Sequence, residues 1–323
     1  MTSPYAQVPY RACSVGGCTQ ATLQRRADGC ILINAVEPLA PYPERLTDRL
    51  EHWAARTPDH TFAARRRQGG EWERISFAQM LARAQGIAQA LATRGLSAER
   101  PIAILSENDL DHLSLAFGAM WAGVPYAPVS TAYSLVSQDF GKLRHILGKL
   151  TPGLVFASSP AYAKAIAAVV GPDVEVVLAQ GDLQGALEGR PTTAFSELLH
   201  TAPGAQGAAA HARVTGDTIV KFLFTSGSTK LPKGVMSTNR MLSANLQMIC
   251  QSSVFLTEAP PVLVDWLPWT HTFGGSHNVG IALATGGTLT IDDGKPTPAG
   301  MNETLRNLRE VPSTVHYNVP QGF

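Results

Sequence analysis

TIVKFLFTSGSTKLPKG, residues 218–234, is the stretch that says most about the fold of this chain. Residues 218–224 are almost wholly apolar and predict a buried strand. The residues that follow are hydroxyl side chains, glycines, a proline and lysines, which are typical of a turn. Apolar spacing typical of a helix runs from about Met241 to Cys250. A buried strand that leads through a turn toward a helix indicates an α/β fold.

The turn after this strand has the chemistry of a phosphate-binding loop. Gly227 has no Cβ, so a bulky anion can approach the backbone there. Successive backbone N–H groups in such a turn can form a nest for phosphate oxygens. Hydroxyl groups add hydrogen-bond donors, and a lysine adds positive charge. The candidate polyphosphate-binding residues are Thr225, Ser226, Gly227, Ser228, Thr229 and Lys233.

Two other interpretations of this turn fit the residues less well. A Walker A loop requires Gly-x-x-x-x-Gly-Lys-Ser/Thr. Counted from Gly227, Pro232 stands at the second glycine position and Gly234 follows Lys233, so the pattern fails twice. An ordinary Ser/Gly-rich surface loop would not need a buried strand directly before it. The residues therefore favour a phosphate-binding loop of another type.

Four segments, in order, resemble motifs of the adenylate-forming superfamily, which contains acyl-CoA synthetases, luciferases and peptide-synthetase adenylation domains. Residues 225–234 resemble its phosphate signature Thr-Ser-Gly-Ser/Thr-Thr-Gly-x-Pro-Lys-Gly, with Lys230 in place of a glycine. Lys230 could disturb a site that needs positive φ, or could add a phosphate contact. ISFAQM (75–80) is similar to Leu-Thr-Tyr-x-Glu-Leu, WAGVPYAPV (121–129) to Lys-Ala-Gly-x-x-Tyr-Val-Pro, and LPWTHTFGG (267–275) to Leu-Pro-x-x-His-x-x-Gly.

Within that superfamily the chain is most similar to bacterial feruloyl-CoA synthases. The resemblance extends from about Pro41 to the last residue and is carried by YAPV, YSLVSQDFGKLRH, VDWLPW and IDDGKPTP, at residues 126–129, 133–145, 264–269 and 291–298. It implies an acid–thiol ligase that uses ATP, magnesium and coenzyme A. Such an enzyme converts an aromatic, ferulate-like carboxylate to an acyl-adenylate and then to an acyl-CoA. A medium- or long-chain fatty acyl-CoA synthetase is the alternative.

The resemblance also implies roles for individual residues. Residues 225–229 and Lys233 would hold the β- and γ-phosphates of ATP with magnesium assisting, and the sequence identifies no metal ligand. Catalysis of this reaction rests mainly on positioning and charge neutralisation. His271 would order the carboxylate, as a catalytic and substrate-binding residue beside the acyl and pantetheine pocket. The other implied substrate-pocket residues are Trp269, Phe273, Gly274 and Gly275.

The residues around His271 permit other interpretations when they are taken alone. A histidine between Trp269 and Phe273 is more often a partly buried structural side chain than a catalytic one. Trp266 and Trp269 have an odd spacing, so on a strand they face opposite sides and at most one faces a ligand. Gly274 and Gly275 would let a substrate pass close to the backbone.

Other polar clusters are assigned no catalytic chemistry. Asn278 stands where a serine-hydrolase Gly-x-Ser-x-Gly motif needs its second glycine, so that reading is rejected. Asp292–Asp293 before a glycine is more typical of a solvated turn than of a metal site. The cysteines form no Cys-x-x-Cys pair, which argues against a zinc site; they are Cys13, Cys18, Cys30 and Cys250.

Composition excludes several classes of protein. The chain has 323 residues, of which 45% are hydrophobic and 16% charged, enough for a sizeable core. A formal net charge of +1 argues against a dedicated nucleic-acid binder. No apolar run has the length of a membrane span, and the N-terminus lacks the features of a signal peptide. These observations predict a cytoplasmic protein and leave its oligomeric state open.

Helix and strand patterns alternate from about Pro43 and predict an α/β fold with stacked parallel sheets and flanking helices. Ser76 and Gln79 predict a capping box at one helix start. The expected helices span about 77–91, 111–121, 137–150, 161–170, 241–250, 277–285 and 304–308. The expected strands span 101–105, 153–156, 174–178, 218–224, 262–267, 288–291 and 314–319. The expected organisation is an irregular extension (1–42), a first α/β subdomain (43–200), a linker loop (201–213) and a second α/β subdomain with the phosphate loop (214–323).

The resemblance covers only the N-terminal part of the superfamily's pattern. The superfamily's Tyr-Gly-x-Thr-Glu box, its ribose-binding aspartate and the catalytic lysine of its C-terminal domain do not occur in this sequence. The expectation is therefore an incomplete N-terminal domain that does not catalyse ATP–pyrophosphate exchange by itself. A catalytically inactive nucleotide- or partner-binding protein is the second class of function that fits the sequence.

Overall fold

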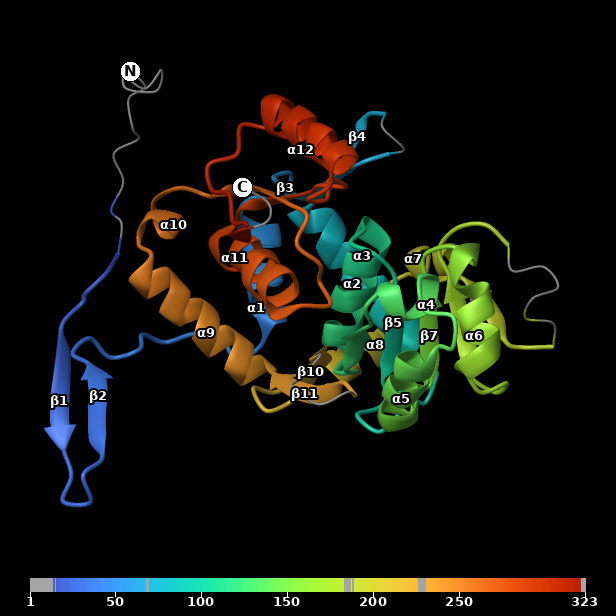
Figure 1. Ribbon diagram of the computed structural model, residues 1–323, viewed down its shortest axis with the longest axis horizontal. Coiled ribbons are helices and arrows are strands. Elements are labelled where there is room, and N and C mark those ends of the chain that lie inside the picture. Colours follow the sequence, from blue (N-terminus) through green and yellow to red (C-terminus); the bar gives the residue numbers. More distant parts are fainter. Residues whose placement is uncertain are drawn as a thin grey trace.

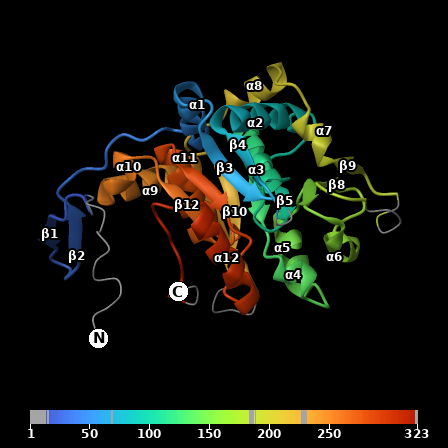
Figure 2. The same cartoon turned by 90° about the horizontal axis from the view of Figure 1, so that it is seen from above.

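The computed structural model describes residues 14, 16–67, 70–182, 187, 189–225 and 231–320. These residues form two β-sheets with helices between and around them (Figure 1). A separate β-hairpin, β1 (Ala21–Arg25) and β2 (Ile31–Ala35), stands away from the body in both views (Figure 1, Figure 2). The hairpin lies in the N-terminal segment that was expected to be irregular, so that expectation was wrong.

The larger sheet has seven strands in the order β11-β10-β6-β5-β7-β8-β9. All neighbouring strands are parallel except β10 and β11, which form an antiparallel pair. The strands are β5 (Ile102–Leu105), β6 (Tyr126–Pro128), β7 (Leu154–Ala157), β8 (Glu175–Leu178), β9 (Thr192–Ala194), β10 (Ile219–Thr225) and β11 (Lys233–Thr238). The sequence predicted β10 but not β11, so the phosphate-loop segment connects two paired strands before the next helix begins.

The smaller sheet has four strands in the order β12-β13-β3-β4, with β4 antiparallel to β3 and the others parallel. Its strands are β3 (Thr61–Arg66), β4 (Trp72–Ser76), β12 (Val262–Asp265) and β13 (Thr288–Ile291). The strand expected over 314–319 is reduced to a single bridge between Val315 and Leu263. Each sheet contains strands from before residue 201 and from after residue 213. The expected boundary between two subdomains at 201–213 therefore does not separate the two sheets.

The helices follow the expected alternation, with one correction. They are α1 (Leu46–Arg56), α2 (Phe77–Leu91), α3 (Leu110–Ala122), α4 (Ala132–Leu135), α5 (Gly141–Leu150), α6 (Ala163–Val169), α7 (Phe195–Leu199), α8 (Ala205–His211), α9 (Asn239–Ser252), α10 (Phe255–Glu258), α11 (Val279–Thr285) and α12 (Pro298–Glu310), with a 3-10 turn η1 (Pro160–Tyr162) and a π-helical turn η2 (Phe273–Asn278). Helix α8 occupies the segment expected to be a linker loop, because its alanines favour helix more than the glycines around them oppose it.

The core consists of two layers, one on each face of the seven-stranded sheet. Helices α2 and α3 lie between the two sheets, where Phe62 of β3 contacts Phe77 and Phe117 at ring-centroid distances of 4.8 and 5.5 Å. Helices α5 and α6 cover the other face. Alternation along β5 explains this, since Ile104 faces the first layer and Leu105 the second. The predicted fold class, α/β with parallel sheets and flanking helices, is confirmed.

The predicted capping box is also confirmed. Ser76 and Gln79 form a reciprocal capping box at the start of α2. Gly123 ends α3 in the left-handed conformation, with φ of 69°, which glycine adopts at little cost. Among the described residues, no helix is long and apolar enough to cross a membrane.

Candidate functional site

The carboxyl ends of four strands meet around one cavity. Residues after β5 and β6 of the larger sheet and after β12 and β13 of the smaller sheet line it, and its volume is about 420 Å³. The lining includes Ser106, Asn108, Thr131, Trp266, Thr270 and Lys295. Ligands of open α/β sheets bind outside the carboxyl ends of the strands, so this cavity is the first candidate for a binding site.

Asn108 connects the two sheets at the base of this cavity. Its Nδ2 donates to the carbonyl of Leu267 at 2.9 Å, and the N–H of Trp269 donates to its Oδ1 at 2.9 Å. Across the mouth, Lys295 Nζ lies 2.8 Å from Glu107 Oε1. Sequence patterns did not indicate Asn108, because its partners are about 160 positions away along the chain.

His271 lies in the turn that follows the two residues bonded to Asn108, and its side chain is exposed. Its N–H donates to the carbonyl of Pro268, and its carbonyl accepts from Gly275. The N–H of Phe273 donates to His271 Nδ1 at 3.3 Å. Because Nδ1 accepts, the proton of the neutral ring is on Nε2, which remains able to donate to a ligand.

An aromatic cluster follows directly after His271. Phe273 and His277 of η2 and Tyr317 contact one another edge to face, with ring centroids 4.8 to 6.0 Å apart. His277 Nδ1 lies 2.8 Å from Asn278 Oδ1 and is therefore its donor. The sequence predicted Phe273 as a pocket residue but missed His277 and Tyr317, which are separated from each other by 40 positions.

Gly274 and Gly275 have a structural explanation that differs from the expected one. A Cβ at Gly274 would lie 2.3 Å from the carbonyl oxygen of Leu267, and a Cβ at Gly275 would lie 2.3 Å from that of Trp269. The glycines therefore allow η2 to pack against the preceding backbone. The predicted passage of a substrate close to these two residues stays a prediction.

Only one of the two tryptophans lines the cavity, but it is Trp266 and not Trp269 as expected. Trp269, which was expected in the substrate pocket, is only 4% exposed and packs edge to face on His112 at 5.1 Å. Trp266 lines the cavity instead, with its Nε1 donating to Asn318 Oδ1 at 3.2 Å.

The phosphate loop is flanked by an aligned pair of residues. Thr225 ends β10 opposite Lys233, which begins β11, and both side chains are exposed. His145 Nε2 lies 3.1 Å from the carbonyl oxygen of Pro232 and holds the returning strand to α5. The predicted phosphate ligands Ser226, Gly227, Ser228 and Thr229, together with Lys230, lie outside the described residues.

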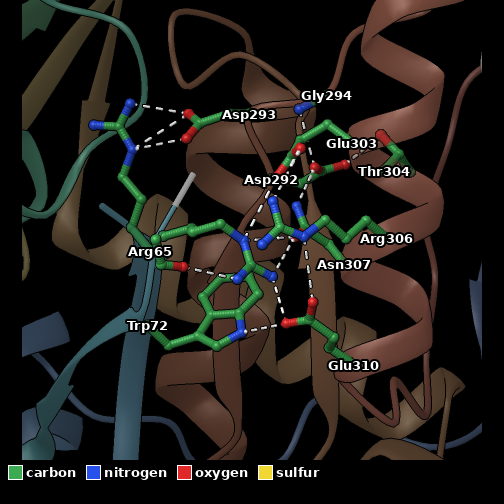
Figure 3. Close-up of polar contacts among 12 residues, drawn as sticks. Arg65, Trp72, Asp292, Asp293, Gly294, Glu303, Thr304, Arg306, Asn307 and Glu310 are labelled. Carbon is green, nitrogen blue, oxygen red and sulfur yellow. Dashed lines mark hydrogen bonds and ion pairs between the residues drawn. The ribbon is translucent and has the colours of Figure 1, made fainter. Parts of the chain in front are cut away.

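Only Asp293 of the Asp292–Asp293 pair has the exposure expected of a solvated turn. Asp292 is buried and accepts from Thr304 Oγ1 at 2.6 Å and from Asn307 Nδ2 at 2.8 Å, which anchors α12 to the end of β13 (Figure 3). Asp293 forms an ion pair with Arg65 at 2.9 Å (Figure 3). Both line the cavity, so this wall is held by α12 and β3.

Burial shifts the pKa of several groups around the site. It raises the pKa of Asp265, at the end of β12, to about 7, against the opposing effects of the Leu267 N–H and Asn278. It lowers the pKa of Lys221 on β10 to about 7. The described residues contain no group of three or more His, Cys, Asp or Glu side chains that could hold a metal ion.

The fold is that of an α/β domain with mostly parallel sheets, and the comparisons give its family. The model of the AMP-binding enzyme family matches residues 50–323. The chain therefore belongs to the AMP-binding enzyme family.

Curated relatives cover different carboxylate classes. A putative fatty-acid–CoA ligase of Mycobacterium tuberculosis is 26% identical over 212 residues, which are 64% of this chain and 33% of the relative. A 4-hydroxybenzoate–CoA/benzoate–CoA ligase of Rhodopseudomonas palustris is 29% identical over 177 residues, which are 53% of this chain and 30% of the relative. The chain thus spans about a third of the length of these relatives.

Solved structures share the fold. The adenylation domain of a keto acid-selecting peptide-synthetase module superposes with a TM-score of 0.68 at 19% identity, over 87% of this chain and 47% of that one. A putative long-chain-fatty-acid CoA ligase from Rhodopseudomonas palustris gives 0.68 at 21% identity, over 86% and 64%. The predicted superfamily is confirmed, whereas feruloyl-CoA synthase remains a prediction.

Proposed function

We propose that this chain belongs to an enzyme that activates an aromatic carboxylate with ATP and transfers the acyl group to coenzyme A. The observation that carries the proposal is the cluster of Phe273, His277 and Tyr317 directly after His271. The faces and edges of these rings are apolar surfaces against which the ring of a ferulate-like acid can pack. The relationship to a benzoate–CoA ligase supports an aromatic substrate.

The reaction assigns a task to each side of the site. A carboxylate oxygen attacks the α-phosphorus of ATP and the bond to pyrophosphate breaks; the thiol of coenzyme A then attacks the acyl carbon and AMP leaves. Thr225 and Lys233, with residues 226–229, bind the phosphates. His271 orients the carboxylate through its Nε2–H. Magnesium would enter with the phosphates of ATP, which are its usual ligands in such sites.

The test compares ferulate with octanoate on matched variants of Tyr317. Tyr317→Leu removes the ring, and Tyr317→Phe keeps it. We expect Tyr317→Leu to weaken ferulate binding about three- to tenfold, from the loss of ring contacts, and to change octanoate binding less than about twofold. Calorimetric titration of the purified chain with each acid measures this.

Two outcomes would favour other functions. Tighter binding of octanoate than of ferulate would assign the site to a medium- or long-chain fatty acyl-CoA synthetase, as the relationship to a fatty-acid–CoA ligase suggests. Absence of any Mg-ATP binding by the chain would contradict the phosphate role and leave a partner-binding protein.

A further inference from the structure

Lys221 is an ammonium group buried in the joint between the two sheets. It lies on β10, four residues before Thr225, and is 3% exposed. Its Nζ donates to the carbonyl oxygen of Gly275, in η2, at 2.7 Å, and lies 6.0 Å from the ring centroid of Tyr126. Burial alone lowers its pKa to about 7, and no carboxylate offsets that effect.

A charge in such a place is costly, and an apolar side chain would pack there more cheaply. Neighbouring positions of β10, such as Val220 and Leu223, are indeed apolar and buried. The lysine reaches across to the other layer because its long stem and terminal donors can bridge a gap that no backbone group of β10 spans. The hydrogen bond from Lys221 to Gly275 therefore needs an explanation other than packing.

We propose that Lys221 is a positioning residue that ties the strand carrying the phosphate loop to the turn carrying Phe273 and His277. The relevance of this tie to catalysis rests on the function proposed above. Through it, the nucleotide side and the acyl side of the site keep a constant separation, which in-line attack between two bound substrates requires.

The surroundings of Lys221 support a rigid joint. His112 of α3 and Tyr126 of β6 are the titratable side chains that face it, and burial lowers the pKa of His112 with a further contribution from Lys221. Trp269 packs on His112, and Gly275 lies against the backbone of Trp269. Elements of both sheets and α3 thus converge on the acceptor of the Lys221 hydrogen bond.

Hydrogen–deuterium exchange of the purified chain tests the tie directly. Lys221→Met keeps the length of the side chain and removes the donor, Lys221→Arg keeps a charged donor, and Lys164→Met replaces an exposed lysine of α6 as the control. We expect residues 273–278 to exchange about tenfold faster in Lys221→Met, from the loss of one charged hydrogen bond, and within about threefold of wild type in Lys221→Arg. The melting temperature of Lys221→Met should not fall, because a buried charge has been removed.

A second measurement uses Mg-ATP as the probe. In the wild-type chain, Mg-ATP should slow exchange at 273–278, and Lys221→Met should lose this effect while binding Mg-ATP within about threefold of wild type. Exchange at 273–278 that is equal in Lys221→Met and Lys164→Met would overturn the proposal. If the wild-type chain binds no Mg-ATP, the proposed function fails, but the ligand-free comparison still decides whether Lys221 holds the turn.

Discussion

Replacement of Arg66 by alanine is the change whose effect on stability the structure allows us to work out most fully. Arg66 ends β3 and is 6% exposed. Its guanidinium donates to the carbonyl of Gly70 and to Oδ1 of Asn307, pairs with Glu310 at 2.5 Å and stacks on Trp72 at 4.3 Å from the ring centroid. Of these partners, Asn307 and Glu310 belong to α12 and Trp72 belongs to β4 (Figure 3).

The expected cost follows from the partners that the substitution leaves behind. Asn307 is 1% exposed, so its Oδ1 loses a charged donor without gaining water, at about 1–3 kcal/mol. Loss of the stacking on Trp72 adds about 1 kcal/mol. Glu310 is solvated and adds little. We expect Arg66→Ala to lower the free energy of unfolding by about 3 kcal/mol.

Arg65 is the matched control, since it is the preceding residue and pairs with Asp293 at the surface, where the side chains are 30% and 42% exposed. Arg65→Ala should cost less than about 1 kcal/mol. Arg66→Lys should fall between the two, because a lysine cannot reproduce the planar fork. Urea unfolding followed by circular dichroism and tryptophan fluorescence measures the differences at constant m-value. Equal effects at Arg65 and Arg66 would refute the reasoning.

Three further predictions concern the site. Gly274→Ala should cost about 1–3 kcal/mol because its Cβ meets the Leu267 carbonyl, whereas Gly148→Ala in α5, where nothing lies within 4 Å, should be neutral or stabilising; thermal melts of both decide this. The native pKa of Asp265, about 7, is above its unfolded value, so the native state binds more protons and stability decreases as pH rises from about 4 to 7. Asp265→Asn should therefore gain stability relative to wild type between pH 5 and pH 8, and parallel pH profiles would contradict this. Lys233→Ala should weaken Mg-ATP binding in titrations with little change in melting temperature, because the side chain is exposed; a large decrease in melting temperature would instead make Lys233 structural.

Local chemistry explains which elements the sequence predicted. Ser76 and Gly123 act within one turn of their own helix, and buried strands such as β5 and β7 are continuous apolar runs. Strand β11 was missed because its residues are largely exposed, so it lacks an apolar pattern and owes its structure to pairing with β10. The expected loop at 201–212 contains α8, which is stabilised by packing against α2 and α3.

The site was predictable only where one segment carries it. The segment 267–275 marked His271 and Phe273, but Asn108, in the turn after β5, and Tyr317, after the bridge at Val315, contact this segment from distant parts of the chain. Trp269 was assigned to the pocket because spacing can show that two side chains face opposite ways but not which one faces the core. Asp292 was taken for a turn residue because its partners, Thr304 and Asn307, are 12 and 15 positions away, and the predicted helix around them gave no sign that it packs against the end of β13.

Contacts on both sides of His271 hold its backbone in place and leave its side chain exposed. Asn108 holds the backbone before it, the close approach of Gly274 and Gly275 to that backbone permits the tight turn after it, and Lys221 holds Gly275 from the other sheet. A histidine needed only for packing would be buried with its neighbours. Here Trp269 and Gly274 are buried and the imidazole is exposed, with Nδ1 accepting from a backbone N–H and Nε2 able to donate. Preorganised surroundings around one available donor are what a group that orients a ligand requires.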